Sequence, residues 1–155
     1  MRDHKIIYKN NGEIPSDELS LIEHALEATF NAYAPYSNFN VGAAILLDDG
    51  SIIKGANQEN AAFPSGLCAE RVAIFHIMNS FPNQKILKIA ITARKEKSTD
   101  HFPAAPCGGC RQVMLEQEQK QGKPIEVIFQ SNENWIKISS TLELLPYSFD
   151  KNSLK

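Results

Sequence analysis

The sequence predicts an α/β fold of three layers, α/β/α, in which helices cover both faces of a mixed sheet of five strands. Two observations support this fold class. Apolar runs of strand length alternate with segments of helical periodicity along most of the 155 residues, an order that requires parallel strands joined through helices. Two of the runs are instead joined by Asp48-Asp49-Gly50, a turn sequence typical of an antiparallel hairpin. We expect a single domain over residues 1–155.

The predicted first helix lies between two prolines. Ser16, directly after Pro15, is the expected N-cap, and Pro35 ends the helical pattern. Apolar side chains recur between them at the spacing of one helix face: Leu19, Ile22, Leu26, Phe30 and Tyr33. The two strands of the hairpin follow at residues 41–47 and 52–55.

The later elements alternate between helix and strand. Helical periodicity spans 68–79 and 107–121, the second ending before Gly122. Apolar strand runs cover 86–93, 125–129 and, as a fifth strand, 135–138, and a short helical turn is expected at 141–145. Each helix begins where a strand-to-helix connection ends. We therefore expect both helix N-termini at the carboxyl edge of the sheet, where sites of open α/β sheets are commonly built.

Composition and charge narrow the classes of partner. The 16 basic and 18 acidic residues are spread along the chain and give a formal charge of −2, so no basic stripe is present to follow a polynucleotide backbone. The N-terminal segment has no apolar run of signal-peptide length, and the longest apolar stretch, 41–47, is too short to span a bilayer. We expect a cytoplasmic protein with neither a nucleic-acid nor a membrane partner.

All three cysteines lie at the two predicted helix starts. Cys68 precedes Ala69-Glu70, and Cys107 and Cys110 form Pro-Cys-Gly-Gly-Cys with Pro106. Helix starts favour thiolates, and three protein ligands are the number at a catalytic zinc, which leaves a fourth position for water. An odd number of cysteines fits metal binding in a reducing compartment better than disulfides. The alternatives are three buried small residues or a redox pair.

The four histidines are candidates for a further ligand. His101, in the loop before Cys107, is the one real competitor. His76 lies about 12 Å along its helix from Cys68, and His4 and His24 lie outside the cysteine-bearing segments.

Charged residues beside the cysteines could complete such a site. Glu70 could take a proton from water at the metal without ligating it, although an isolated glutamate here would simply complement the helix dipole. Three thiolates leave a zinc site with a charge of about −1, which disfavours ionisation of that water. Arg71 and Arg111 directly follow the two clusters and are candidates to donate hydrogen bonds to the sulfurs. The alternative for both is a solvated surface position.

With these residues in place, the chain resembles the small homotetrameric zinc-dependent cytidine deaminases, within the cytidine and deoxycytidylate deaminase family. The resemblance covers a motif-bearing core at about 33–149. It rests on four motifs: YAPYSNFNVGAA at 33–44, NQENAAFPSGLCAER at 57–71, PCGGCRQV at 106–113 and LELLPYSF at 142–149.

The resemblance implies a role for each of these site residues. Cys68, Cys107 and Cys110 would bind one zinc ion and Glu70 would shuttle protons, with Arg71 donating to the thiolates. Asn57 and Glu59 would hold the ribose hydroxyls, Ala69 would donate its backbone N–H to the pyrimidine O2, and Phe39 would form an aromatic wall. Phe149 would reach the pocket of a neighbouring subunit in a homotetramer.

The implied reaction is hydrolytic deamination of cytidine and 2′-deoxycytidine to uridine and 2′-deoxyuridine, with release of ammonia, in pyrimidine salvage. A neutral nucleoside needs hydroxyl-binding groups and a stacking surface but no phosphate cradle. Two alternatives remain: a deaminase of a cytosine-nucleoside antibiotic such as blasticidin S, and a non-catalytic zinc-containing RNA-binding or structural module. The near-neutral charge and Glu70 speak against the second.

Two features depart from the family pattern. Phe63 stands where many relatives carry tyrosine. The segment 94–105 is long and could form a flexible cover beside Cys107.

Overall fold

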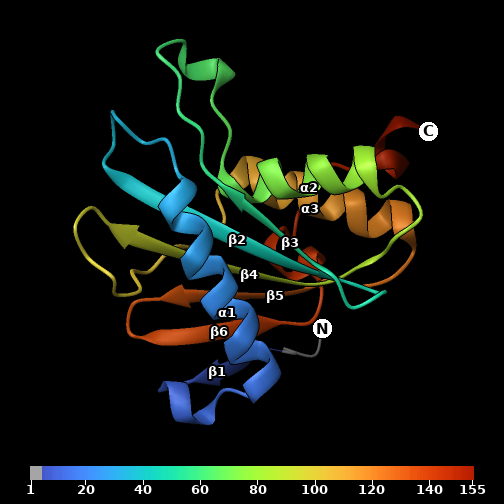
Figure 1. The fold of residues 1–155 in the computed structure, drawn as a ribbon. Coiled ribbons are helices and arrows are strands. Elements are labelled where there is room, and N and C mark those ends of the chain that lie inside the picture. Colours follow the sequence, from blue (N-terminus) through green and yellow to red (C-terminus); the bar gives the residue numbers. More distant parts are fainter. Residues whose placement is uncertain (1–4) are drawn as a thin grey trace.

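The computed structural model describes residues 5–155 and has one mixed sheet between two helical layers (Figure 1). Helix α1 covers one face, and α2 and α3 lie side by side on the other. The helices are α1 (Ser16–Ala28), α2 (Ala69–Ser80) and α3 (Gly108–Gln121), and the strands are β1 (Ile6–Tyr8), β2 (Phe39–Leu47), β3 (Ile52–Ala56), β4 (Ile86–Lys95), β5 (Glu126–Ser131) and β6 (Asn134–Ile138). The predicted α/β class is confirmed. His4 lies outside the described residues.

Within residues 5–155 the sheet has six strands rather than the predicted five, in the order β1-β6-β5-β4-β2-β3. The additional strand is β1, which pairs antiparallel with β6 through the register Ile6↔Lys137 to Tyr8↔Trp135. Three residues are too short a run to show a strand pattern, and this strand forms because β6 offers it a free edge.

Strand directions also differ from the prediction. Among the strands described, β4 and β5 are the only parallel neighbours. The strand that follows α2 does not pair with β3, from which the chain enters that helix. It pairs with β2, which runs antiparallel to both β3 and β4. The connection through α2 therefore crosses over β2. Strands β3 and β4 run in the same direction but are not hydrogen-bonded to each other, because β2 lies between them.

The ends of the helices differ slightly from the predicted ones. Ser16 is the first helical residue of α1, and the N-cap position belongs to Pro15, so the predicted serine cap is wrong. The α-helix ends at Ala28, and a 3-10 turn at Thr29–Asn31 continues it. The C-cap of α3 is Gly122, with φ of 67°, as its position after the helical run predicts.

Two glycines allow helices to approach the hairpin closely. A Cβ atom on Gly42 of β2 would lie 1.9 Å from the carbonyl oxygen of Ala25 in α1. A Cβ atom on Gly55 of β3 would lie 2.5 Å from the carbonyl oxygen of Ala69, at the start of α2. The N-terminus of α2, where Cys68 sits, therefore packs directly against β3.

A buried cluster of charges joins α1 to the far strands. Glu18 accepts hydrogen bonds from Lys88 of β4 at 2.6 Å and from Lys137 of β6 at 2.5 Å, and its side chain is 3% exposed. Tyr8 of β1 donates to the same carboxylate at 3.0 Å. Burial alone would raise the pKa of Glu18, but the hydrogen bonds from the two lysines outweigh it and the pKa is lowered. The cluster ties the β1 edge to α1.

In residues 5–155 we find no helix with both the length and the apolar character needed to cross a membrane.

Candidate zinc centre and active site

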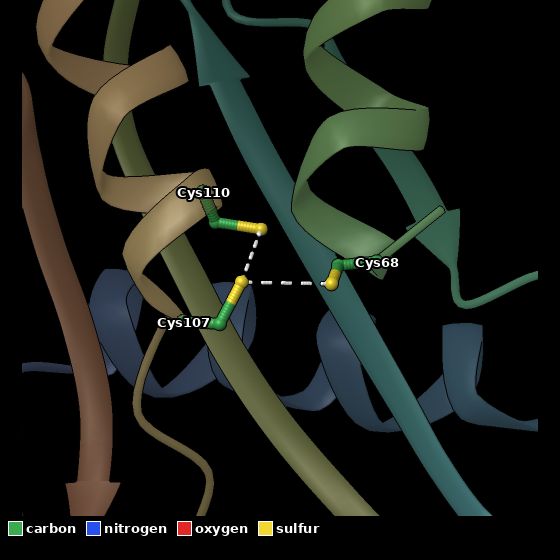
Figure 2. Close-up of side chains that lie close together, drawn as sticks. All are labelled: Cys68, Cys107 and Cys110. Atoms are coloured by element: carbon green, nitrogen blue, oxygen red, sulfur yellow. Dashed lines mark hydrogen bonds between the residues drawn. The ribbon is translucent and has the colours of Figure 1, made fainter. Parts of the chain in front are cut away.

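The three cysteine side chains converge between the starts of α2 and α3 (Figure 2). Cys68 is the N-cap of α2 and Cys107 the N-cap of α3, and Cys110 lies in the first turn of α3. The Cys68 and Cys107 sulfurs are 3.7 Å apart, and those of Cys107 and Cys110 are 3.5 Å apart. Both helix N-termini therefore point at the sulfur cluster, where their unpaired N–H groups favour negative charge.

The sulfur cluster fits a zinc ion. All three Sγ atoms lie within 4.8 Å of one another, and a tetrahedral zinc with Zn–S bonds of about 2.3 Å separates its sulfurs by about 3.8 Å. Exposure differs among the three cysteines, since Cys110 is buried and Cys107 exposed. His101 does not join them. Its ring packs edge-on to Trp135, and its Nδ1 lies 3.0 Å from the Thr92 hydroxyl.

Glu70 is buried beside the sulfur cluster. It is 3% exposed, at the second position of α2. Burial raises its pKa to about 7, and the negative charge of Cys68 acts in the same direction. A carboxyl with this pKa can both accept and donate a proton near neutral pH.

The cysteine side chains are hydrogen-bonded to one another, and this changes their pKa values. The pKa of Cys68 is lowered to about 5, because Cys110 and Arg71 donate hydrogen bonds to its sulfur. The pKa of Cys110 is raised, since its thiol is the donor to Cys68 and is itself buried. The protein groups alone thus favour one thiolate at Cys68, and zinc would hold all three ligands deprotonated.

The two arginines have different partners. Arg71 donates from its terminal nitrogen to the Cys68 sulfur at 3.5 Å, and its pKa is raised mainly by this hydrogen bond. Its Nε is buried without a hydrogen-bond partner among the described residues. Arg111 instead donates to the carbonyl oxygens of Pro106 at 2.8 Å and Leu144 at 3.4 Å. The suggestion that Arg111 donates to the sulfurs is therefore wrong.

A cavity of about 690 Å³ opens beside the sulfur cluster. Its volume lies in the range of small-molecule pockets. Seven of the residues that were assigned a site role from the sequence line it: Phe39, Asn57, Glu59, Cys68, Glu70, Arg71 and Cys107.

The two predicted ribose-binding residues are held by hydrogen bonds to the backbone. Asn57 accepts from the Val41 N–H at 2.8 Å and donates to the Phe39 carbonyl at 2.9 Å. Glu59 accepts from the Tyr36 N–H at 2.9 Å and from the hydroxyl and N–H of Ser37. Each side chain is thereby fixed in orientation, while one Asn57 N–H and further lone pairs on both residues stay available to a ligand.

Two predicted contact residues are not among the described residues that line this cavity. Ala69 is fully buried at the start of α2. Phe149 is 63% exposed, and its carbonyl oxygen accepts a hydrogen bond from Gln112 of α3 at 2.9 Å. The assignment of Phe149 to a neighbouring subunit's pocket stays a prediction.

The sequence assigned no contact role to the remaining walls, although Phe63 was noted as a departure from the family pattern. Tyr36 and Phe63 form one wall, with their rings edge to face and the centroids 6.1 Å apart. Pro103, Ala104 and Ala105 form another. The only sequence signal for the second wall was the length of the segment 94–105. Its first two residues belong to β4, and Phe102 is paired with that strand by two backbone hydrogen bonds, so the segment is attached to the sheet at both of these points; a role as a flexible cover stays a prediction.

Comparisons with known proteins agree with this geometry. Residues 15–122 match the family described as "Cytidine and deoxycytidylate deaminase zinc-binding region". Cytidine deaminase from Halalkalibacterium halodurans is 45% identical over 100 residues, which cover 64% of this chain and 71% of the relative. Cytidine deaminase from Sporosarcina psychrophila is 36% identical over 138 residues, or 89% of this chain and 95% of the relative.

Solved structures give the same result. The crystal structure of cytidine deaminase from Burkholderia pseudomallei matches with a TM-score of 0.68 at 36% identity, covering 88% of this chain and 100% of its own. Cytidine deaminase from Mycobacterium tuberculosis matches with a TM-score of 0.68 at 31% identity, covering 88% of this chain and 99% of its own.

Proposed function

Because the chain belongs to the cytidine and deoxycytidylate deaminase family, we propose that its cavity binds cytidine and 2′-deoxycytidine and that both are hydrolysed with release of ammonia. The chain is a zinc-dependent hydrolase that deaminates cytidine. Deoxycytidine as a second substrate and a place in pyrimidine salvage are the further parts of the proposal. The observation that carries the proposal is Glu70, buried beside three convergent thiols on the wall of a nucleoside-sized cavity.

The proposed chemistry divides between the metal and one carboxyl. Cys68, Cys107 and Cys110 would hold the zinc ion, which when bound would supply a Lewis acid that promotes the ionisation of water. Glu70 takes one proton from the attacking water and passes it to N3 of the pyrimidine. It then takes the second proton from the new hydroxyl on C4 and delivers it to the amine that leaves C4. The water oxygen forms the new bond to C4, the C4–N4 bond breaks, and the products are uridine and ammonia. The raised pKa of Glu70 suits this alternation.

The proposed substrate contacts follow from the cavity walls. The ring of Phe39 stacks on the pyrimidine, Asn57 and Glu59 bind the ribose hydroxyls, and the backbone N–H of Ala69 binds O2. The fixed orientations of the two polar side chains support this assignment, because a preoriented group loses less entropy on binding. Arg71 withdraws charge from the Cys68 thiolate, as its hydrogen bond to that sulfur suggests.

We further propose a homotetramer in which Phe149 of one chain lines the pocket of another. The exposed ring of Phe149 outside its own cavity supports this arrangement. We propose residues 1–155 as one domain, and the cytoplasm as its compartment, because reducing conditions keep three free thiols available for metal.

The decisive experiment measures zinc content per chain together with ammonia release from cytidine, 2′-deoxycytidine and blasticidin S. We expect one zinc per chain and ammonia from the two nucleosides. Turnover of the antibiotic well above that of cytidine would favour the antibiotic deaminase. Zinc without ammonia from any of the three would favour the non-catalytic module.

A further inference from the structure

Phe102 forms an aromatic pair with Phe39 behind the cavity wall. The two ring centroids are 5.7 Å apart with an interplanar angle of 85°, an edge-to-face contact. Phe39 lines the cavity, whereas Phe102 is not among the described residues that do. We propose that Phe102 is a positioning residue, which holds the Phe39 ring in the plane that stacks on the pyrimidine. This inference rests on the proposed function.

The backbone of Phe102 is fixed to the edge of β4. Its N–H donates to the Ala93 carbonyl at 2.7 Å, and the Ala93 N–H donates back at 3.1 Å. The ladder between β4 and β5 ends at the pair Ile91↔Phe129. Phe102 therefore occupies the edge of β4 that β5 no longer covers, one strand away from Phe39 on β2.

The neighbouring residue anchors the other face of the same segment. His101 lies with its Nδ1 3.0 Å from the Thr92 hydroxyl and its Nε2 3.5 Å from a Glu23 carboxylate oxygen of α1, and its ring contacts Trp135 edge-on at 5.3 Å. Successive side chains of an extended segment point to opposite faces. With His101 held on the α1 face, the ring of Phe102 is directed to the cavity face.

A further contact restrains the Phe102 ring. Lys95 of β4 pairs with Phe39 in the β2–β4 register, and its Nζ lies 4.4 Å from the centroid of the Phe102 ring. The Lys95 ammonium group thus contacts one face of the Phe102 ring, and the same ring makes the edge-to-face contact with Phe39. Phe39 is the first residue of β2, where a ring without such support would sample more orientations. A ring already held in its bound orientation binds its ligand more tightly.

The test compares Phe102→Ala with the parent enzyme in the zinc-loaded form. We expect the KM for cytidine and the dissociation constant for uridine, measured by calorimetry, to rise about three- to tenfold, the range of an aromatic pair contact. The value of kcat should change less than twofold, and zinc should stay at one per chain. Phe102→Tyr, which keeps the ring edge, should restore both constants. If Phe102→Ala does not fold, Phe102→Leu fills the space without an aromatic edge, and the same constants should rise.

Phe81 offers a matched control. It makes a similar edge contact with His76, at 5.6 Å and 86°, and it does not line the cavity beside the zinc ligands. Phe81→Ala should leave the KM for cytidine unchanged.

A double-mutant cycle tests whether Phe102 acts through Phe39. In a Phe39→Ala background, Phe102→Ala should raise the KM and the uridine dissociation constant no further. An equal rise in both backgrounds, or a loss of kcat at constant KM in the single variant, would overturn the positioning role. If the parent enzyme is active and Phe102→Ala has the same KM as the parent, the positioning role is overturned and the proposed function stands. A parent chain that neither deaminates cytidine nor binds uridine overturns the proposed function as well.

Discussion

Replacing Glu70 by glutamine should move catalysis and stability in opposite directions. The amide keeps the size of the side chain but cannot accept a proton. One general acid–base group contributes about 10²- to 10⁴-fold, and Glu70 is proposed to act at successive transfers, so deamination should fall by several orders of magnitude. Zinc should remain bound, because its three cysteine ligands are untouched.

The stability change follows from the burial of the carboxyl. The pKa of Glu70 rises from an ordinary 4.5 to about 7 on folding, because the side chain is buried. An acid whose folded pKa is raised opposes folding when it is ionised. This penalty is absent below the unfolded pKa, grows as the pH rises, and is complete above about pH 7. It amounts to at most about 3 kcal/mol, and glutamine removes it.

The assay is urea unfolding of chelator-treated proteins, followed by the fluorescence of Trp135, with deamination measured on zinc-loaded protein. Metal-free Glu70→Gln should be more stable than the metal-free parent at about pH 8, and equally stable at about pH 4. Glu116→Gln, on the exposed side of α3, is the matched control and should change neither property. Near-normal turnover in zinc-loaded Glu70→Gln would refute the proton role, and equal stabilities at pH 8 would refute the burial penalty.

Three other variants test separate parts of the molecule. Arg71→Gln should lower kcat more than substrate affinity and move the rising limb of the pH–rate profile to higher pH, because the thiolate loses its cationic donor; an unchanged profile would count against this role. Removal of residues 147–155 should raise the KM and leave zinc bound, and an equally active monomer, seen by gel filtration, would contradict a shared site. Glu18→Gln should lower the free energy of unfolding by about 1–3 kcal/mol, since Lys88 and Lys137 lose their buried carboxylate partner and keep only the more exposed Glu126 among the described ion pairs. Because the folded pKa of Glu18 is lowered, the parent's advantage in urea unfolding should be present above about pH 4.5 and disappear in acid; a difference that persists in acid would show that packing, not charge, is responsible.

Local signals account for the parts that the sequence predicted. The hairpin turn could be predicted because such turns need a residue with positive φ, which glycine adopts readily. Gly50 does so in the structure, with a φ of 86°. The bounds of α2 and α3 lie within a residue of their predicted ones, since Cys68 and Cys107 mark where each periodicity begins. The convergence of the cysteines followed from these two helix starts, and zinc binding from the three thiols.

The features that the sequence did not predict depend on contacts between residues far apart in the chain. β1 forms against β6 from residues more than a hundred positions away, and nothing in its own three residues requires that partner. Sequence spacing could not distinguish the side chain of Arg71, which meets a sulfur, from that of Arg111, which meets carbonyl oxygens. The edge that Phe102 occupies exists only because the β4–β5 ladder ends at Ile91, which is a property of the assembled sheet.

Gly55 lies on the hairpin and is not one of the proposed zinc ligands, yet it influences the distance between their sulfur atoms. Any side chain there would press on the Ala69 carbonyl and shift the helix start that carries Cys68, while Cys107 stayed with α3. A zinc centre tolerates ligand distances within about 0.2 Å, less than such a shift. The close packing of the hairpin at Gly55 therefore fixes the distance between the Cys68 sulfur and the sulfurs of α3. A substitution scan restricted to the cysteines would overlook Gly55.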